Sequence, residues 1–374
     1  MQVLVLGGYG FFGTRIVRLL AREPGLEVLV AGRHRDSAQA LVHALPDARA
    51  RLSAVGVDIR DRAGLARLLA TQPTGVVIHT CGPFQGQDHA VAKACLAAGW
   101  HYLDLADGRT FVSGITALDA EARARGVLVA SGCSSVPGLS GAVVAALAAR
   151  LDRLDTIDIG ISPGNRTDRG LATVKAILSY GGEAIPAFRD GRPVTVRGWG
   201  ATHRHRYAPP VGTRWLADCD VPDHVLLPAR YPGVREVRFR AGLELPVLHF
   251  GMMCLALLRR LRLLPNLSRL AVPLKRISEW FLPFGSDHGA MHVTVSGADR
   301  AGTSCRLAWE LDALHGDGPY VPALCSVALT LRIARGQPVP AGAMAAPAGA
   351  TLDEILAVAE GLAIRTTLTE TEIP

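Results

Sequence analysis

A glycine-rich segment near the N-terminus has the residue types and spacing of a dinucleotide-binding loop. Gly8, Gly10 and Gly13 form the pattern Gly-x-Gly-x-x-Gly between an apolar run at residues 2–6 and an amphipathic stretch at 12–22. In such loops the first glycine permits a tight turn, the second lets the backbone approach the pyrophosphate, and the third lets helix and strand pack closely. The N-terminus of the following helix supplies N–H donors and a partial positive charge. We therefore predict a cofactor-binding loop made of Gly7, Gly8, Tyr9, Gly10, Phe11, Phe12 and Gly13.

Arg33 stands where an NAD-selective domain carries an acidic residue. Such domains place Asp or Glu about 20 residues after the glycines, where it binds the ribose 2′-hydroxyl. This chain reads Ala31-Gly32-Arg33 instead. An arginine can pair with a 2′-phosphate while its planar group covers the adenine, so we predict NADP as the cofactor. The alternative, a solvated loop arginine, stays open because a missing acid does not by itself establish NADP selectivity.

Two further strand ends carry candidate cofactor contacts. Ligands of parallel sheets bind outside the carboxyl ends of the strands. Asp58 ends the third predicted strand, where its carboxylate reaches the adenine edge or caps the helix that follows. We expect the next such segment, Cys81, Gly82 and Pro83, to border the nicotinamide half of the cofactor.

The catalytic residues are less evident, because hydride transfer needs mainly orientation and one nearby proton donor. Polar side chains are predicted on loops at the carboxyl ends of the last two strands, and each has a structural alternative. Asp104 is also suited to anchor buried hydrogen bonds, and Cys133 to fill a small space in the core. We expect catalytic roles for Asp107, Tyr102 and His288, and substrate contacts from Phe84, Ser134 and Ser135.

The sequence offers little support for other classes of function. Gly-x-Ser-x-Gly, His-Glu-x-x-His and P-loop motifs are absent, which disfavours hydrolases. The seven cysteines are widely spaced without a metal-binding pattern, so we expect no metal and a reducing compartment. The net charge of +7 comes almost entirely from scattered arginines, and we expect no nucleic-acid partner.

The elements that must position these residues alternate regularly through residues 1–135. Apolar runs without polar alternation are typical of a parallel sheet buried on both faces, and amphipathic stretches between them are long enough for crossover helices. We therefore predict the α/β class, with residues 1–135 as a Rossmann-type doubly wound domain. The predicted strands are 2–6, 27–31, 53–57, 75–80, 100–105 and 126–131, and the predicted helices are 12–22, 37–45, 61–71, 87–98 and 115–125.

A second, α+β domain is predicted over residues 136–318, where it would shape the substrate site. Its signals are a strand at 156–161, a helix near 170–180, a hairpin at Asp190-Gly191, and two strands at 291–295 and 304–311. Helices are predicted again at 319–336 and 351–362. We expect the C-terminal part, about 319–374, to pack back near the first domain.

Residues 243–283 form an unusual apolar segment that carries several arginines. Its longest uninterrupted apolar run, from Phe250 to Leu258, is shorter than the roughly 20 residues that cross a bilayer. One interpretation is a buried helix pair with a basic outer face. Another is an interfacial surface that contacts a membrane or admits an apolar substrate. We expect the segment to form part of the substrate entrance.

Several segments together resemble the saccharopine dehydrogenase-like family of NAD(P)-dependent oxidoreductases. The resemblance implies an N-terminal Rossmann domain, a second domain that shapes the substrate site, and hydride transfer with a nicotinamide cofactor; it does not imply saccharopine as the substrate. Residues 200–283, rich in Arg, Leu and Pro, look more like the lipid-associated branch than the amino-acid-metabolising one. The matching segments are 7–13, 31–33, 81–84, 101–107, 132–133, 136–139, 284–287 and 316–323.

We therefore predict an NADP-dependent oxidoreductase that transfers hydride to a C=N or C=C bond of an apolar or acyl-bearing small molecule. Two alternatives come from other classes of function: a non-catalytic NADP-binding sensor or scaffold, and a peripheral membrane protein with a vestigial cofactor site that acts through 243–283. The N-terminus begins a strand at once, so we expect a cytoplasmic location. Contact with the membrane periphery and a homodimer both stay open.

Overall fold

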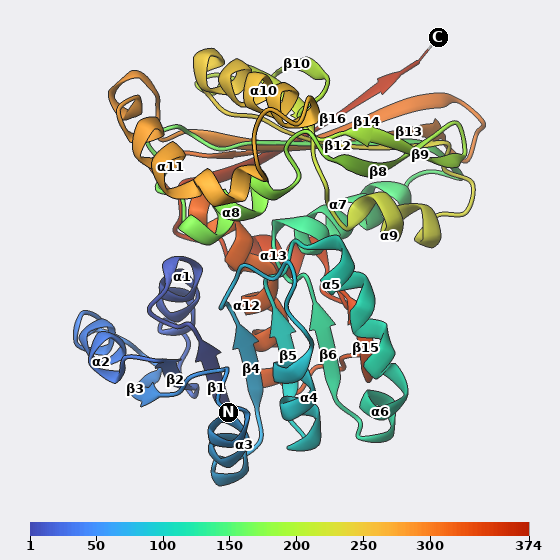
Figure 1. Ribbon diagram of the computed structural model, residues 1–374. Coiled ribbons are helices and arrows are strands. Elements are labelled where there is room, and N and C mark those ends of the chain that lie inside the picture. Colours follow the sequence, from blue (N-terminus) through green and yellow to red (C-terminus); the bar gives the residue numbers. More distant parts are fainter. Residues whose placement is uncertain (374) are drawn as a thin grey trace. The chain divides into compact units, whose positions relative to one another are not determined.

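The computed structural model describes residues 1–373, and the chain divides into two compact units (Figure 1). Unit 1 comprises Met1–Leu139 and Tyr320–Glu360, and unit 2 comprises Ser140–Pro319 and the residues from Gly361 onward. Unit 1 is thus built from two separate stretches of the chain.

Unit 1 contains a seven-stranded parallel sheet with flanking helices, which confirms the predicted doubly wound α/β fold (Figure 1). The strand order is β15-β6-β5-β4-β1-β2-β3, so the order reverses between β1 and β4. This reversal is the switch point at which such sheets bind ligands. The strands are β1 (Gln2–Leu6), β2 (Glu27–Gly32), β3 (Arg51–Gly56), β4 (Val76–His79), β5 (His101–Asp104), β6 (Leu128–Ser131) and β15 (Gly342–Ala345).

The helices of unit 1 follow the predicted alternation with the strands. Every residue of β1 is buried, as a strand covered on both faces requires. The C-terminal stretch adds α12, which packs against α1 and α13 and buries most of its side chains. The helices are α1 (Phe11–Leu20), α2 (Arg35–His43), α3 (Arg62–Thr71), α4 (Ala90–Ala97), α5 (Arg109–Gly114), α6 (Asp119–Ala124), α12 (Val321–Ala334) and α13 (Leu352–Ala357).

Unit 2 contains a mixed, mostly antiparallel sheet of nine strands with its own helices. The predicted hairpin is present, because Asp190 and Gly191 both have positive φ between β8 and β9, as a tight two-residue turn requires. The strands are β7 (Arg153–Ser162), β8 (Ala184–Arg189), β9 (Arg192–Arg197), β10 (Thr202–Arg206), β11 (Thr213–Asp218), β12 (Glu236–Ala241), β13 (Gly289–Ala298), β14 (Ser304–Ala313) and β16 (Ile364–Glu372).

Five longer helices belong to unit 2, and the predicted apolar segment 243–283 contains two of them, α10 and α11. No helix within residues 1–373 is long and apolar enough to cross a membrane. The helices are α7 (Ser140–Ala148), α8 (Leu171–Ser179), α9 (Asp223–Arg230), α10 (Pro246–Arg260) and α11 (Ala271–Glu279).

The last residues of the chain differ from the prediction. We expected residues 319–374 to accompany the first domain, but Ile364–Glu372 forms β16, which pairs with β14 in the sheet of unit 2. Nearly all of β16 is exposed, and its threonines and glutamates give no apolar face. The strand therefore lacks the periodicity on which strand prediction depends.

Candidate cofactor-binding and active site

The glycine loop leaves β1 in a conformation that only glycine adopts readily. Gly7 has a φ of +80°, and a Cβ there would lie 2.6 Å from Thr80 Oγ1. The N–H groups of Gly7 and Gly8 donate to the Ala31 carbonyl, at 2.8 and 3.0 Å. These bonds hold the loop against the end of β2.

Gly10 and Gly13 have different roles in this loop. A Cβ on Gly13 would lie 2.1 Å from the Gly7 carbonyl oxygen, so Gly13 is needed for α1 to pack against the loop. A Cβ on Gly10 would meet only Gly7, at 3.0 Å, and otherwise point into open space. No side chain in the described chain caps α1, and its first turn holds no acidic residue. The N–H groups of that turn therefore suit an anion such as a pyrophosphate.

Tyr9 joins the glycine loop to the end of β2. Its hydroxyl accepts a hydrogen bond from the His34 N–H at 2.9 Å. Gly32 leaves room for this side chain, because a Cβ there would lie 2.4 Å from the Tyr9 ring and displace it. Arg33 lies between these two contacts and is exposed. The predicted cofactor contacts Tyr9 and Arg33 thus belong to one local structure at the carboxyl ends of β1 and β2.

Asp58 does not cap the following helix, which was one of its two predicted roles. Asp61 caps α3 instead, by accepting a hydrogen bond from the Gly64 N–H. Asp58 accepts hydrogen bonds from the backbone and guanidinium of Arg60. These bonds lower the pKa of Asp58 to about 2, with a smaller contribution from the charge of Arg33. Asp58 is therefore an anion at neutral pH, near Arg33.

Thr80, which directly follows β4, connects this strand to the glycine loop, and it was not among the residues predicted from the sequence. The Thr80 hydroxyl donates to the carbonyls of Leu6 and Gly7, at 2.8 and 3.2 Å. Burial raises the pKa of the neighbouring Cys81 to about 12, although the charge of Arg33 opposes this. Cys81 is therefore a neutral thiol beside the predicted cofactor site. The only sequence signal for Thr80 was its place at a strand end.

Phe84, for which the sequence predicted a substrate contact, has a largely buried side chain. It is 5% exposed. Its ring packs against those of His79 and Phe111, with centroids 5.1 and 5.2 Å away. The aromatic side chain therefore fills the core below the edge of the sheet. The preceding loop, Cys81–Pro83, is held by the Gln87 amide, which donates to the carbonyls of Cys81 and Pro83.

Tyr102 also differs from the prediction, because it lies inside β5 and not on a loop. It has no exposed surface, and its hydroxyl hydrogen-bonds His79 Nδ1 at 3.0 Å. Burial raises the pKa of Tyr102 well above its usual value. A phenol enclosed in the core cannot donate a proton to a bound substrate, so we no longer assign it a catalytic role.

Asp104 is a buried anchor between two strand ends. Its Oδ1 accepts hydrogen bonds from the Ala106 and Gly132 N–H groups and from the Ser131 hydroxyl, at 2.8–3.0 Å. Burial raises the pKa of Asp104, although these three donors oppose the shift. The carboxyl group thus fixes the loops that follow β5 and β6.

The remaining unit 1 candidates lie on those two loops. Asp107 is partly exposed, and its Oδ1 accepts a hydrogen bond from the Gln85 amide at 3.1 Å. Ser135 is also partly exposed, whereas Ser134 is buried and its backbone bonds to Gly132 and Leu139. The predicted substrate contact thus finds more support at Ser135 than at the buried Ser134.

His288 lies in unit 2, beside a hydrogen-bonded network centred on Glu244. Glu244 accepts hydrogen bonds from Asn165, from Ser286 and from Arg214, whose guanidinium lies 3.1 Å away. Burial alone would raise the pKa of Glu244, but these donors outweigh it and lower the pKa. His288 Nδ1 lies 3.0 Å from Asp287 Oδ1. Glu244 was not among the residues for which the sequence predicted a role.

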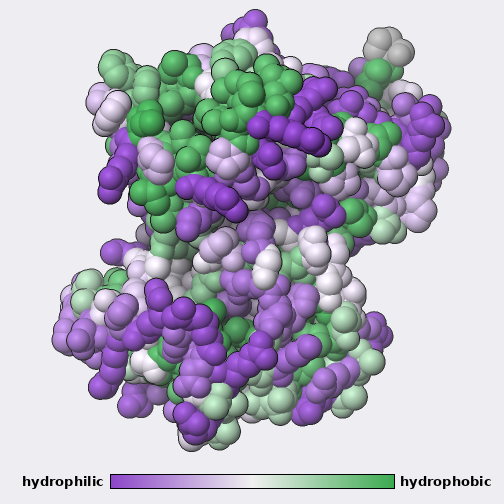
Figure 2. Space-filling model, in the orientation of Figure 1, coloured by the Kyte–Doolittle hydropathy of each residue, from purple (hydrophilic) through white to green (hydrophobic). Residues whose placement is uncertain are grey.

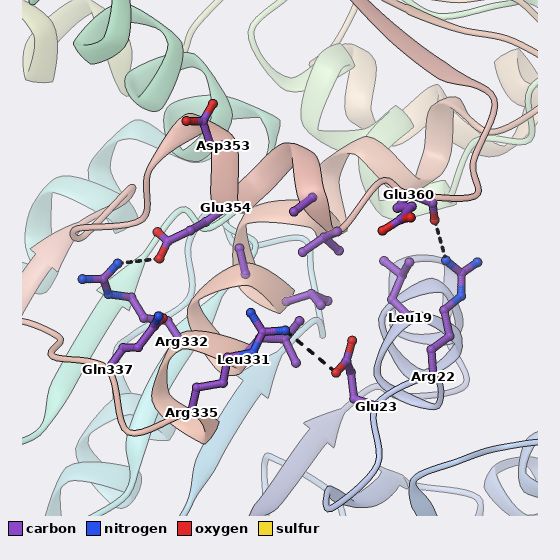
Figure 3. Close-up of a pocket in the computed structure, with 14 residues that line it drawn as sticks. Leu19, Arg22, Glu23, Leu331, Arg332, Arg335, Gln337, Asp353, Glu354 and Glu360 are labelled. Atoms are coloured by element: carbon purple, nitrogen blue, oxygen red, sulfur yellow. Dashed lines mark hydrogen bonds and ion pairs between the residues drawn. The ribbon is translucent and has the colours of Figure 1, made fainter.

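One cavity of unit 1 lies away from the glycine loop. It has a volume of about 590 Å³ and lies between the C-terminal end of α1, α12 and α13 (Figure 3). Ion pairs cross it, including Arg332 with Glu354 at 2.6 Å and Arg335 with Glu23 at 4.0 Å. Because the cofactor loop adjoins the opposite end of α1, we do not assign this cavity to the cofactor. No side-chain cluster within residues 1–373 could hold a metal ion.

Comparisons with known proteins agree with this geometry. Residues 3–129 match the family model described as the saccharopine dehydrogenase NADP binding domain. N-acetyl-gamma-glutamyl-phosphate reductase of Symbiobacterium thermophilum is 33% identical over 107 residues, which cover 28% of this chain and 28% of the reductase. Apo saccharopine dehydrogenase (L-Glu forming) from Saccharomyces cerevisiae has a TM-score of 0.69 at 15% identity, over 100% of both chains.

The structural likeness establishes the fold, and the family match covers the part of unit 1 that carries the glycine loop. These findings confirm the resemblance inferred from the sequence. Residues 3–129 are therefore similar to the NADP binding domain of saccharopine dehydrogenases, and the chain carries a Rossmann domain of the NAD(P)-binding type at its N-terminus.

Proposed function

We propose that the protein is an NADP-dependent oxidoreductase that reduces a C=N or C=C bond of an apolar or acyl-bearing small molecule. The observation that carries this proposal is the joined arrangement of the open glycine loop and the exposed Arg33, which Tyr9 holds together. When bound, the reduced nicotinamide supplies the hydride.

The residues present fit such a cofactor. The uncapped start of α1 would hold the pyrophosphate, and the clear space beside Gly10 lets it approach the backbone. Arg33 would pair with the 2′-phosphate, because a guanidinium binds phosphate through charge-assisted hydrogen bonds. The loop Cys81–Pro83, fixed by Gln87, would border the nicotinamide half.

We assign substrate orientation and proton transfer to Asp107 first, and to His288 as the candidate of unit 2. Asp107 is the partly exposed carboxylate at the carboxyl end of β5, and Gln85 orients it. The nearby thiols of Cys81 and Cys133 are not suited to nucleophilic catalysis, because burial raises the pKa of both groups. For Cys133 the pKa lies well above its usual value. A neutral thiol is a poor nucleophile, which favours direct hydride transfer over a covalent thiolate route.

The experiment is a screen of imines, enoyl compounds and ketones, followed by NADPH absorbance. We expect turnover with at least one imine or enoyl series. Binding should strengthen with acyl chain length by up to about 0.8 kcal/mol for each buried methylene. NADPH binding without consumption would favour the sensor or scaffold instead. Preference for polar, saccharopine-like compounds would contradict the apolar substrate.

A substitution then tests the proposed role of Asp107. We expect Asp107→Asn to lower kcat by about 100-fold or more while NADPH affinity is kept, because a positioned general acid or base contributes at least that factor. Asp47→Asn makes the same change on an exposed loop of unit 1 and should leave kcat unchanged. Unchanged turnover in the Asp107 variant would remove the carboxylate from the mechanism.

A further inference from the structure

Unit 2 exposes a large apolar surface on one helical segment. Of the fourteen large hydrophobic side chains that are exposed in the described chain, ten lie between residues 247 and 284. Figure 2 shows hydrophobic side chains gathered over α10 and α11. We call this surface the α10–α11 patch; its residues are Val247, Phe250, Leu257, Leu261, Leu263, Val272, Ile277, Trp280, Leu282 and Phe284.

The helix α10 is apolar on both of its faces, but only one face packs within the unit. Its inner residues Met252 and Ala256 belong to a buried cluster with Trp199 of the same unit. Its outer face carries exposed hydrophobic residues at helical spacing, such as Phe250 and Leu257. A helix on a protein surface ordinarily has polar residues on its outer face. An apolar patch of this kind therefore marks an interaction surface.

The most exposed members of the patch are aromatic. Trp280, which follows α11, is 75% exposed, and Phe284 is 74% exposed. Burial of such side chains contributes strongly to binding, and exposed Trp and Phe are typical of segments that enter the boundary between lipid headgroups and acyl chains.

The patch is surrounded by positive charge. Residues 245–284 contain six basic residues and one acidic residue, Glu279, which pairs with Lys275. Arg260, Arg269 and Arg276 are exposed among the apolar side chains. In an interface between two copies related by a two-fold axis, the same surface would face itself and bring these like charges together. An anionic surface with an apolar interior has the complementary charge instead.

We propose that the α10–α11 patch binds the surface of a bilayer that contains anionic lipids. The aromatic and aliphatic side chains enter the headgroup boundary, while the arginines contact lipid phosphates. The protein lies on the bilayer and does not span it, in agreement with the short helices of this segment.

The test is flotation of the protein, residues 1–374, with phosphatidylcholine vesicles, with and without phosphatidylglycerol. We expect binding to the anionic vesicles that weakens as salt is raised. Trp280→Glu/Phe284→Glu should lower binding by about tenfold or more, because it removes the inserted aromatics. Val225→Glu/Leu368→Glu replaces two exposed hydrophobic residues of unit 2 outside the patch, and should bind as wild type does.

A second pair of variants tests the charges separately. Arg260→Gln/Arg276→Gln should also lower binding by about tenfold or more, because each basic residue near an anionic surface contributes about fivefold. Arg192→Gln/Arg300→Gln removes two exposed charges of unit 2 outside the patch and serves as the control. All variants should keep the wild-type NADPH affinity and melting temperature, which shows that they fold.

Three results would overturn the proposal. The first is no binding of the wild type to anionic vesicles. The second is binding by Trp280→Glu/Phe284→Glu that equals that of the wild type. The third is a wild-type dimer, measured by light scattering without lipid, that this variant dissociates while vesicles are not bound; the patch would then be the contact with a second copy.

Discussion

Arg33 bears on cofactor choice and contributes little to the fold, because its side chain is exposed at the end of β2. Its replacement should therefore change cofactor binding with little effect on the stability of the fold. We expect Arg33→Asp to weaken NADPH binding by about 2–4 kcal/mol, through the loss of a charge-assisted hydrogen bond and added repulsion, while NADH binding changes little. Arg67→Asp makes the same change on an exposed position of α3 and should bind as wild type does. Calorimetric titration with NADPH and NADH measures both affinities. Unchanged NADPH affinity in Arg33→Asp would refute the role of Arg33 in binding the 2′-phosphate.

His79 should make unit 1 less stable in acid. It is 1% exposed, and burial lowers its pKa from 6.5 to about 4. Between these values the unfolded chain binds a proton that the folded chain does not, so the free energy of unfolding falls as pH drops from 6.5 to 4. The loss from this side chain is about 3.5 kcal/mol at most, since one pKa unit corresponds to about 1.4 kcal/mol.

Chemical unfolding at several pH values measures this effect. His79→Gln should show a shallower dependence than wild type across pH 4 to 6.5, whatever its stability at neutral pH. His43→Gln replaces an exposed histidine at the end of α2 and should keep the wild-type slope. Parallel curves for wild type and His79→Gln would show that His79 does not cause the acid sensitivity.

The sequence indicated the roles of the loop glycines, but it did not indicate that the aromatic side chains of Phe84 and Tyr102 are buried. The tasks of Gly10 and Gly13 follow from spacing, because every contact that they need lies within the local strand, turn and helix. Phe84 and Tyr102 are enclosed by partners distant in the sequence, and Tyr102 hydrogen-bonds His79. Such burial depends on how strands pair across the sheet, which the local pattern does not specify.

At the scale of elements, two glycines of the segment between β1 and α1, Gly10 and Gly13, have separate tasks: Gly13 serves folding and Gly10 serves cofactor binding. A methyl group on Gly13 would lie 2.1 Å from the Gly7 carbonyl oxygen, whereas one on Gly10 would lie 3.0 Å from that oxygen and within 4 Å of no other residue beyond its chain neighbours. We expect Gly13→Ala to destabilise the fold by about 1–3 kcal/mol through overpacking. Gly10→Ala should keep the melting temperature and lower NADPH affinity by about tenfold or more, because the methyl group occupies the approach of the pyrophosphate.

Melting curves and NADPH titrations of the two variants provide the comparison. Each variant serves as the control for the other, since both replace a glycine of the same loop by alanine. Wild-type NADPH affinity in Gly10→Ala would show that the pyrophosphate binds elsewhere.

The elements that were predicted well have strong apolar patterns, and those that were missed do not. The strands β1 and β2 are continuous runs of buried Val and Leu, and they were predicted to within one residue. The strand β15 is Gly-Ala-Met-Ala, without a β-branched residue, and becomes a strand by pairing with β6. Both β15 and β16 depend on partner strands distant in the sequence, and their own residues do not indicate that pairing.

At the scale of the whole molecule, unit 1 depends on a stretch that the chain reaches only after completing most of unit 2. Tyr320–Glu360 supplies β15, which extends the sheet beyond β6, and α12, which packs against α1. The helix α12 includes Leu324 and Leu329, both with no exposed surface. Removing it would expose the apolar surface of α1, next to the cofactor loop, so the first 139 residues should not form a stable domain alone.

We therefore expect the fragment 1–139 to show no cooperative unfolding and no NADPH binding. The same fragment joined through a flexible Gly/Ser linker to residues 320–360 should unfold cooperatively and bind NADPH within about tenfold of the full chain, because it restores all strands of the unit 1 sheet. Leu324→Asp/Leu329→Asp in the joined protein should abolish both properties, since it buries two unpaired charges. Thermal unfolding by circular dichroism and NADPH fluorescence measure the outcome. Full NADPH affinity in the fragment 1–139 alone would mean that α12 and β15 are dispensable, and that the cofactor-binding domain ends at Leu139.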